Sequence, residues 1–319
     1  MKGLSPRPVH PAAQLLMLLG LAVVGLCLAS LLALVLANVF YGLSLVQFGN
    51  LAAMPDQYPQ GWSVLMLYQG LSLAGVGAGA LVMPRLVGQS VAGYFAPRRL
   101  GAAWWPVAAG LVIICSVPFL SALVAWNASA HFSGALQGFG QWARDKEDQA
   151  AGLTKFLTDF NSPGRLLVGL VVIALVPAVA EELVFRGGVQ RCLVQWFKSR
   201  HVGVWLAAAI FSAIHVQFFG FVPRFLLGLV LGYLYEWSGN ILVPMAAHFT
   251  QNAFQLILLY LAQGRHLPSS FDPDANQALP WPTVLLSAAL SLGLLYTLHQ
   301  RMTASPPLPH ATDSTAPSL

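Results

Sequence analysis

Long apolar runs without a charged side chain constrain the fold of this chain more than any other feature. Leu15–Leu36 is one such run, and only 8% of the 319 residues are charged, against about 25% in ordinary soluble domains. Only helices and closed barrels satisfy every backbone polar group in hydrocarbon, and barrel strands would alternate apolar and polar residues with a period of two. The runs show no such alternation. The sequence therefore predicts an all-α fold, a polytopic transmembrane helical bundle.

The number of spans follows from the length of the runs. A spanning helix needs about 20 apolar residues. The first apolar run is too long for the core of a signal peptide, so we interpret it as a membrane anchor. About eight spanning helices are expected, at residues 12–38, 61–84, 101–126, 166–196, 202–219, 222–238, 240–262 and 281–299.

The same pattern divides the chain into four parts. Residues 1–164 would hold the N-terminal transmembrane helices together with an external segment at 127–164, which is charged and suggests an amphipathic helix. Residues 165–262 would form a core, and 263–302 a final loop and helix. The tail, 303–319, is rich in Pro, Ser, Thr and Ala and is expected to be disordered.

The distribution of basic residues predicts the orientation in the membrane. Placing the N-terminus inside puts nine lysines and arginines in the inner segments and six in the outer ones, as the positive-inside rule requires. We therefore expect both termini inside, in a protein of the bacterial inner (plasma) membrane. The net charge of +5 reflects loop arginines. No lysine/arginine cluster with interleaved aromatics occurs, so nucleic acid is not an expected partner.

Small residues and cysteines receive structural interpretations. The pairs Gly75/Gly79 and Gly228/Gly232 have the small-xxx-small spacing that lets helices approach closely. The three cysteines are scattered without a metal-ligand spacing and are interpreted as apolar packing residues.

A few reactive side chains remain inside the apolar segments. Each buried ion costs about 2.5–3.5 kcal/mol to insert into a membrane, so such groups usually pair and mark a functional site. Glu182 and Arg186 have the i, i+4 spacing of a helical ion pair, whereas Glu181 points about 100° away. These angular positions around the helix predict that Glu182 pairs with Arg186, and that Glu181 is free to face other groups. The candidates are Glu181, Glu182, Arg186, His215, His248 and Asn252.

Depth and prolines suggest that these groups converge. From the helical rise of 1.5 Å per residue, Glu181, His215 and His248 are all expected near the middle of the membrane. Pro177 and Pro244 each precede one of them by four residues. Because an interior proline tends to kink a helix, we expect two kinks that help to open a cavity.

Three short motifs carry a family resemblance. Glu181-Glu182-Leu183-Val184-Phe185-Arg186 resembles the EExxxR motif of the CAAX prenyl protease 2 type, also called the CAAX protease and bacteriocin-processing (abortive-infection) family. Phe211–His215 is similar to its FxxxH motif, and His248–Asn252 to its HxxxN motif. The resemblance covers residues 165–260, and it makes 165–262 a CAAX-protease-like catalytic core.

The resemblance implies an intramembrane endopeptidase, a hydrolase that cleaves a membrane-associated peptide or protein near mid-membrane depth. Glu181 would act as the general base that activates a water, with His215 assisting by a hydrogen bond. His248 and Asn252 would donate to the developing oxyanion. Glu182 and Arg186 would support the helix.

Metal use stays open at this point. A variant places Zn²⁺ on Glu181, His215 and His248, a ligand set that suits a zinc metalloprotease. The cofactor is therefore either none or zinc.

Two other functions fit the same residues. Intramembrane acids and histidines on kinked helices also suit a proton-coupled transporter, and a catalytically silent membrane scaffold would retain the motifs without activity. The substrate, and whether it is prenylated, cannot be deduced from the residues.

Overall fold

The computed structural model describes residues 9–264, 266–267 and 279–304, and these ranges contain helices and no strand. The predicted all-α membrane bundle is confirmed. The helices are α1 Pro11–Tyr41, α2 Leu45–Ala53, α3 Gly61–Leu86, α4 Val91–Phe95, α5 Trp105–Ala128, α6 Gln137–Leu157, α7 Pro163–Gly169, α8 Val176–Glu182, α9 Arg191–Phe197, α10 Arg200–Ala213, α11 Phe221–Ser238, α12 Leu242–Gln263 and α13 Trp281–Ala304.

Six segments are long and apolar enough to cross a membrane, fewer than the eight expected. They are α1, α3, α5, residues 163–197, residues 218–238 and α13. The other two expected spans differ for separate reasons. Helix α10 has only 14 residues, too few for a full span. Helix α12 has 22 residues, but His248, Thr250, Gln251 and Asn252 interrupt its apolar character.

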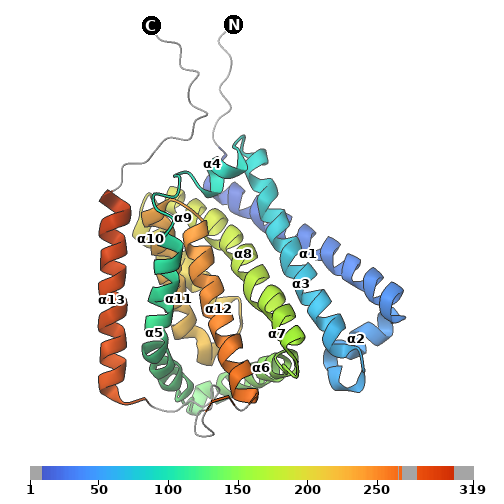
Figure 1. Ribbon diagram of the computed structural model, residues 1–319. Coiled ribbons are helices and arrows are strands. Elements are labelled where there is room, and N and C mark those ends of the chain that lie inside the picture. The colour runs from blue at the N-terminus through green and yellow to red at the C-terminus, as the bar shows by residue number, and fades with distance from the viewer. Residues whose placement is uncertain (1–8, 265, 268–278, 305–319) are drawn as a thin grey trace, which may run out of the picture.

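A continuous helix from Pro163 to Phe197, made of α7, α8, α9 and two π-helical segments, occupies the centre of the fold. It contacts α3 on one side and α10, α11 and α12 on the other. In Figure 1 the pair α1 and α3 lies at one edge of the bundle, and α5 and α13 lie at the other. The central helix therefore carries its side chains into a region enclosed by other helices.

Helices α1 and α3 are joined by glycines in close contact. A Cβ atom on Gly25 or Gly75 would collide with the backbone of the other glycine, and one on Gly79 would collide with the carbonyl of Leu21. The Gly75/Gly79 pair thus lets two backbones meet, as predicted. Gly228 and Gly232 on α11 are restricted less strongly, because their Cβ atoms would meet Ala208 and the flexible Gln190 side chain.

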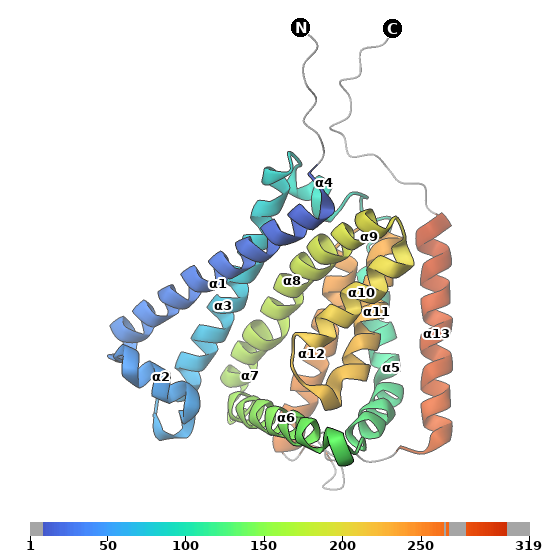
Figure 2. The ribbon, with the colours of Figure 1, turned by 180° about the vertical axis from the view of Figure 1, so that it is seen from behind.

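Helix α6 lies across one end of the bundle, opposite the start of α1 and the end of α13 (Figures 1 and 2). The described part of the chain thus begins and ends on one side and carries α6 on the other. This arrangement fits the predicted topology, while the side that faces the cytoplasm stays a prediction. Residues 303 and 304 of the predicted tail end α13, and the rest of that tail lies outside the described residues.

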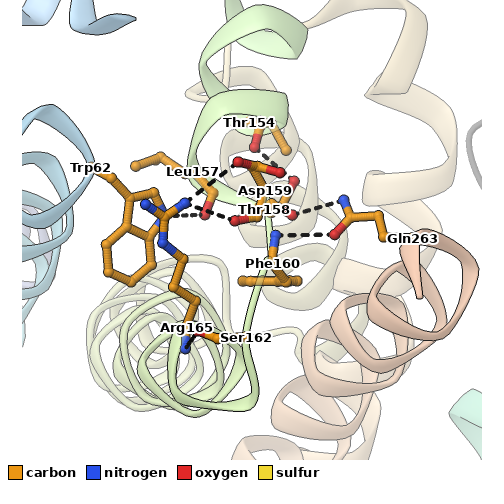
Figure 3. A network of polar contacts seen from close by, with 9 residues as sticks. All are labelled: Trp62, Thr154, Leu157, Thr158, Asp159, Phe160, Ser162, Arg165 and Gln263. Carbon is orange, nitrogen blue, oxygen red and sulfur yellow. Dashed lines mark hydrogen bonds and ion pairs between the residues drawn. The ribbon is translucent and has the colours of Figure 1, made fainter. Parts of the chain in front are cut away.

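A polar cluster fixes the turn between α6 and the central helix (Figure 3). Gln263, at the end of α12, accepts from the Phe160 N–H at 3.0 Å and donates to the Thr158 carbonyl at 2.9 Å. On the other side, Trp62 of α3 donates to the Leu157 carbonyl, and the Arg165 guanidinium lies 4.6 Å from the centre of the Trp62 ring. The start of the central helix is thereby tied to both α3 and α12.

The α1–α3 contact can be tested with two glycines of α1. We expect Gly25→Val to lower the free energy of unfolding by about 1–3 kcal/mol, the usual cost of overpacking, because its side chain would displace α3. Gly20→Val is the matched control, since nothing lies within 4 Å of a Cβ at Gly20. Thermal unfolding of the purified protein in detergent measures both, and equal stability of the two variants would contradict the packing.

Candidate active site

The helix that carries the EExxxR motif is irregular on both sides of the motif's acids. π-Helical segments at Leu170–Leu175 and Leu183–Gln190 flank α8, which ends at Glu182. Such segments are rare and occur often at functional sites. Pro177 is the second residue of α8, two residues after the end of the first π-segment, and a local π-helical adjustment is one way for a helix to accommodate a proline. The backbone before Pro177 therefore departs from a regular α-helix, while the kink predicted there stays a prediction.

The kink predicted at Pro244 is wrong. Helix α12 begins at Leu242, so Pro244 lies in its first turn. The first N–H groups of a helix have no intrahelical partner, and a proline there removes no hydrogen bond. Sequence reasoning placed the helix start a few residues too early.

A buried ion pair lies at the centre of the bundle. Arg186 Nη1 donates to Glu182 Oε1 at 2.8 Å, and the two side chains are 2% and 0% exposed. Arg186 Nη2 donates to the carbonyl of Gly228 on α11 at 3.1 Å, and one turn further Gln190 donates to the carbonyl of Gly232 at the same distance. The predicted Glu182–Arg186 pair is thus present, and it joins the central helix to the glycine face of α11.

His248 contacts both glutamates. Its Nδ1 lies 2.8 Å from Glu182 Oε1, and its Nε2 lies 3.8 Å from Glu181 Oε2. Glu182 Oε1 therefore accepts from His248 as well as from Arg186, a contact that the sequence did not indicate. Glu181 remains the accessible carboxylate of the two, since its side chain is 20% exposed.

His215 lies in a turn rather than on a helix. The predicted fifth span, 202–219, ends as a helix at Ala213, and Val216 has a positive φ of 54°. A valine in this region is a conformational outlier. His215 Nδ1 bonds to the Phe211 carbonyl at 2.7 Å. A carbonyl only accepts, so Nδ1 carries the proton and Nε2 of the neutral ring is left as an acceptor.

Phe211 is a site residue to which sequence reasoning assigned no role. It is 2% exposed, and the rings of His215 and His248 lie edge-on to it at 5.1 and 6.0 Å. The Arg186 guanidinium lies 4.8 Å from the centre of the same ring. Phe211 therefore contacts both histidines, and the first position of FxxxH was the available signal.

Asn252 lies one helical turn after His248 on α12 and is partly exposed. Its side chain has no hydrogen-bond partner among the described residues. The amide is therefore available to a bound molecule.

The residues do not fit the zinc variant. Among the described residues, no group of three or more His, Cys, Asp or Glu side chains is placed to hold a metal ion. In both histidines Nδ1 is engaged, in His248 by Glu182 and in His215 by a backbone carbonyl, so only Nε2 of each ring could bind a ligand. A three-ligand site on Glu181, His215 and His248 is not supported.

Removing the arginine tests the buried pair. We expect Arg186→Ala to destabilise the protein by about 3–5 kcal/mol, because it leaves Glu182 charged and buried without its cation. Arg200→Ala is the control: that arginine is 70% exposed and lies 3.8 Å from Glu236, and such surface pairs contribute about 0–1 kcal/mol. Thermal unfolding in detergent compares the two, and an Arg186→Ala protein as stable as Arg200→Ala would show that the pair is dispensable.

Comparison with known proteins covers the same region. Residues 163–254 match the sequence model of the family described as type II CAAX prenyl endopeptidase Rce1-like. The uncharacterised protein YpbD of Bacillus subtilis (strain 168) is 36% identical over 93 residues, which are 28% of this chain and 44% of that protein. The chain thus spans less than half the length of this relative, and no solved structure matches. The resemblance deduced from the three motifs is confirmed, and residues 163–254 are similar to the Rce1-like family.

Proposed function

We propose that this integral membrane protein is an endopeptidase that hydrolyses a peptide bond inside the membrane. The observation that carries the proposal is the meeting of the three motifs at His248. This ring contacts both glutamates of EExxxR and the phenylalanine of FxxxH, and it begins HxxxN. The Rce1-like domain match supports the same class of enzyme.

Glu181 is the general base of the proposed reaction. It is the more accessible carboxylate, and Arg186 does not hydrogen-bond to it. Glu181 takes a proton from a water, whose oxygen attacks the carbonyl carbon of the scissile bond. His215 positions that water, because its free Nε2 accepts a hydrogen bond from it.

The hydrogen bond between His248 and Glu182 refines the role of His248. With Nδ1 donating to Glu182, the ring can donate from Nε2 only when it carries a second proton. Glu181, 3.8 Å from Nε2, supplies the proton that it took from water. His248 then donates to the oxyanion and passes the proton to the leaving amine, while Glu182 holds the ring as the aspartate of a catalytic triad does.

Asn252 completes the oxyanion site. Its amide donates without changing protonation state, so it can stabilise the oxyanion from the start of the attack. Two donors aimed at a developing charge have their largest effect where water is scarce.

The substrate is proposed to be a membrane-associated peptide or protein that reaches the site from the bilayer. The proposed location is the bacterial inner membrane, with both termini inside. Prenylated and unprenylated peptides are both candidates for the assay.

Replacing the base tests the mechanism. We expect Glu181→Gln to fold normally and to lose at least about 10²-fold in cleavage rate, the usual contribution of a general base. Membrane peptides from cells with the wild-type or variant protein can be compared by proteomics, and candidate substrates then assayed with purified protein. Asp145→Asn, at an exposed carboxylate of α6, is the control. Wild-type rates in Glu181→Gln would remove Glu181 as the base.

Chelation tests the metal question directly. Because no three-ligand site is formed, we expect EDTA or phenanthroline treatment to leave the cleavage rate within about twofold of the untreated enzyme. Inactivation by a chelator together with recovery on adding zinc would contradict this expectation.

A further inference from the structure

Arg224, in the first turn of α11, is a half-buried cation that the proposed reaction does not use. Its Nη2 donates to Gln217 Oε1 at 2.8 Å. Its Nη1 is buried without a hydrogen-bond partner in the described part of the chain. An unpartnered buried donor on a charged group is costly, and it commonly marks a place where a ligand atom binds.

Arg224 is close to the reacting groups. Its hydrogen-bond partner Gln217 is only two residues after His215, so the guanidinium reaches the segment that carries this histidine. The turn at Phe218–Gly220, which includes the residues just after Gln217, brings the start of α11 back beside the end of α10. An anion bound at Arg224 would therefore lie near the bond that Glu181 attacks.

Glu147, an acid outside the three motifs, does not form an ion pair with Arg224. Glu147 of α6 lies within electrostatic range of Arg224, but the described residues include no ion pair between them within 4.0 Å. Glu147 Oε2 is itself buried without a partner. Burial raises the pKa of Glu147 above its ordinary value, although Arg224 and the Phe219 N–H act in the opposite direction. Because no hydrogen bond joins Glu147 to Arg224 in the described residues, the unpartnered Nη1 of Arg224 stays available to another anion.

We propose that Arg224 binds a carboxylate of the peptide substrate close to the scissile bond. The guanidinium fork matches a carboxylate in shape and charge, and the unpartnered Nη1 would donate to it. The carboxylate is either the C-terminus of the substrate or an acidic side chain. This inference rests on the proposed peptidase function and adds the chemical feature by which the site selects its substrate.

Matched peptide sets test the proposal on the full chain in nanodiscs. Three sets of dye-labelled, quenched apolar peptides share their sequences and differ at the end: a free C-terminal acid, a C-terminal amide, and an amide with one aspartate near the terminus. We expect wild-type kcat/KM to be at least about tenfold higher for one of the two carboxylate sets than for the plain amide, as a charge-assisted hydrogen bond predicts. The set that is preferred identifies the source of the carboxylate.

Two variants separate binding from a structural role. Arg224→Gln should bring the ratio of acid to amide cleavage to about one, whereas Glu147→Gln should keep the wild-type ratio. If Arg224 served only to pair with Glu147, both variants would change the ratio alike, and the proposal would be overturned. Equal cleavage of all three sets by wild-type protein overturns it as well, without any variant.

A binding measurement distinguishes this proposal from the peptidase function itself. Cleavage that does not depend on Glu181, or no cleavage of any set, would contradict the proposed function. The binding of the same peptides, made without the quencher, to the Glu181→Gln protein is then measured by fluorescence anisotropy. This measurement tests whether Arg224 forms a carboxylate-binding site. We expect about tenfold tighter binding of a carboxylate set than of the amide set, and equal dissociation constants would overturn the site.

Discussion

The buried pair of Glu182 and Arg186 is the interaction on which the rest of the structure depends. Removing two charges from water costs several kcal/mol per ion, and only good geometry with further hydrogen bonds offsets this. Arg186 finds its second acceptor in the Gly228 carbonyl of α11, and Glu182 accepts from His248 of α12. A shift of either helix along the central one would leave a charged group without its partner. The pair thereby sets the position of both helices that surround the site.

Much of the fold could be predicted because long apolar runs in the sequence predict membrane helices directly. The last helix begins at Trp281, where the sequence placed it. The end of α10 at Ala213 could not be found in this way, because Ile214, Val216 and Phe218 continue the apolar pattern through the turn. What ends the helix is the left-handed backbone at Val216 and the bond from Ser212 to the Phe221 carbonyl, and neither leaves a signal in composition.

The candidate site shows a similar limit. Spacing identified the ion pair, since partners four residues apart on one helix must lie on one face. Spacing could not show that His248 bonds to Glu182, because that contact depends on how α12 packs against the central helix. The part played by Phe211 was missed for the same reason: its ring contacts come from three different segments.

The adjacent position of the two glutamates follows from the shape of an imidazole ring. Its two nitrogens face different directions, so two acceptors that contact both must diverge. Neighbouring residues on a helix diverge by about 100°, which lets Glu182 lie against Nδ1 while Glu181 lies toward Nε2. The inner carboxylate is fully buried, and its Oε1 contacts both Arg186 and His248, whereas the outer one is partly exposed. One helical step thus separates a buried carboxylate held against Nδ1 of the histidine from a partly exposed carboxylate near its Nε2.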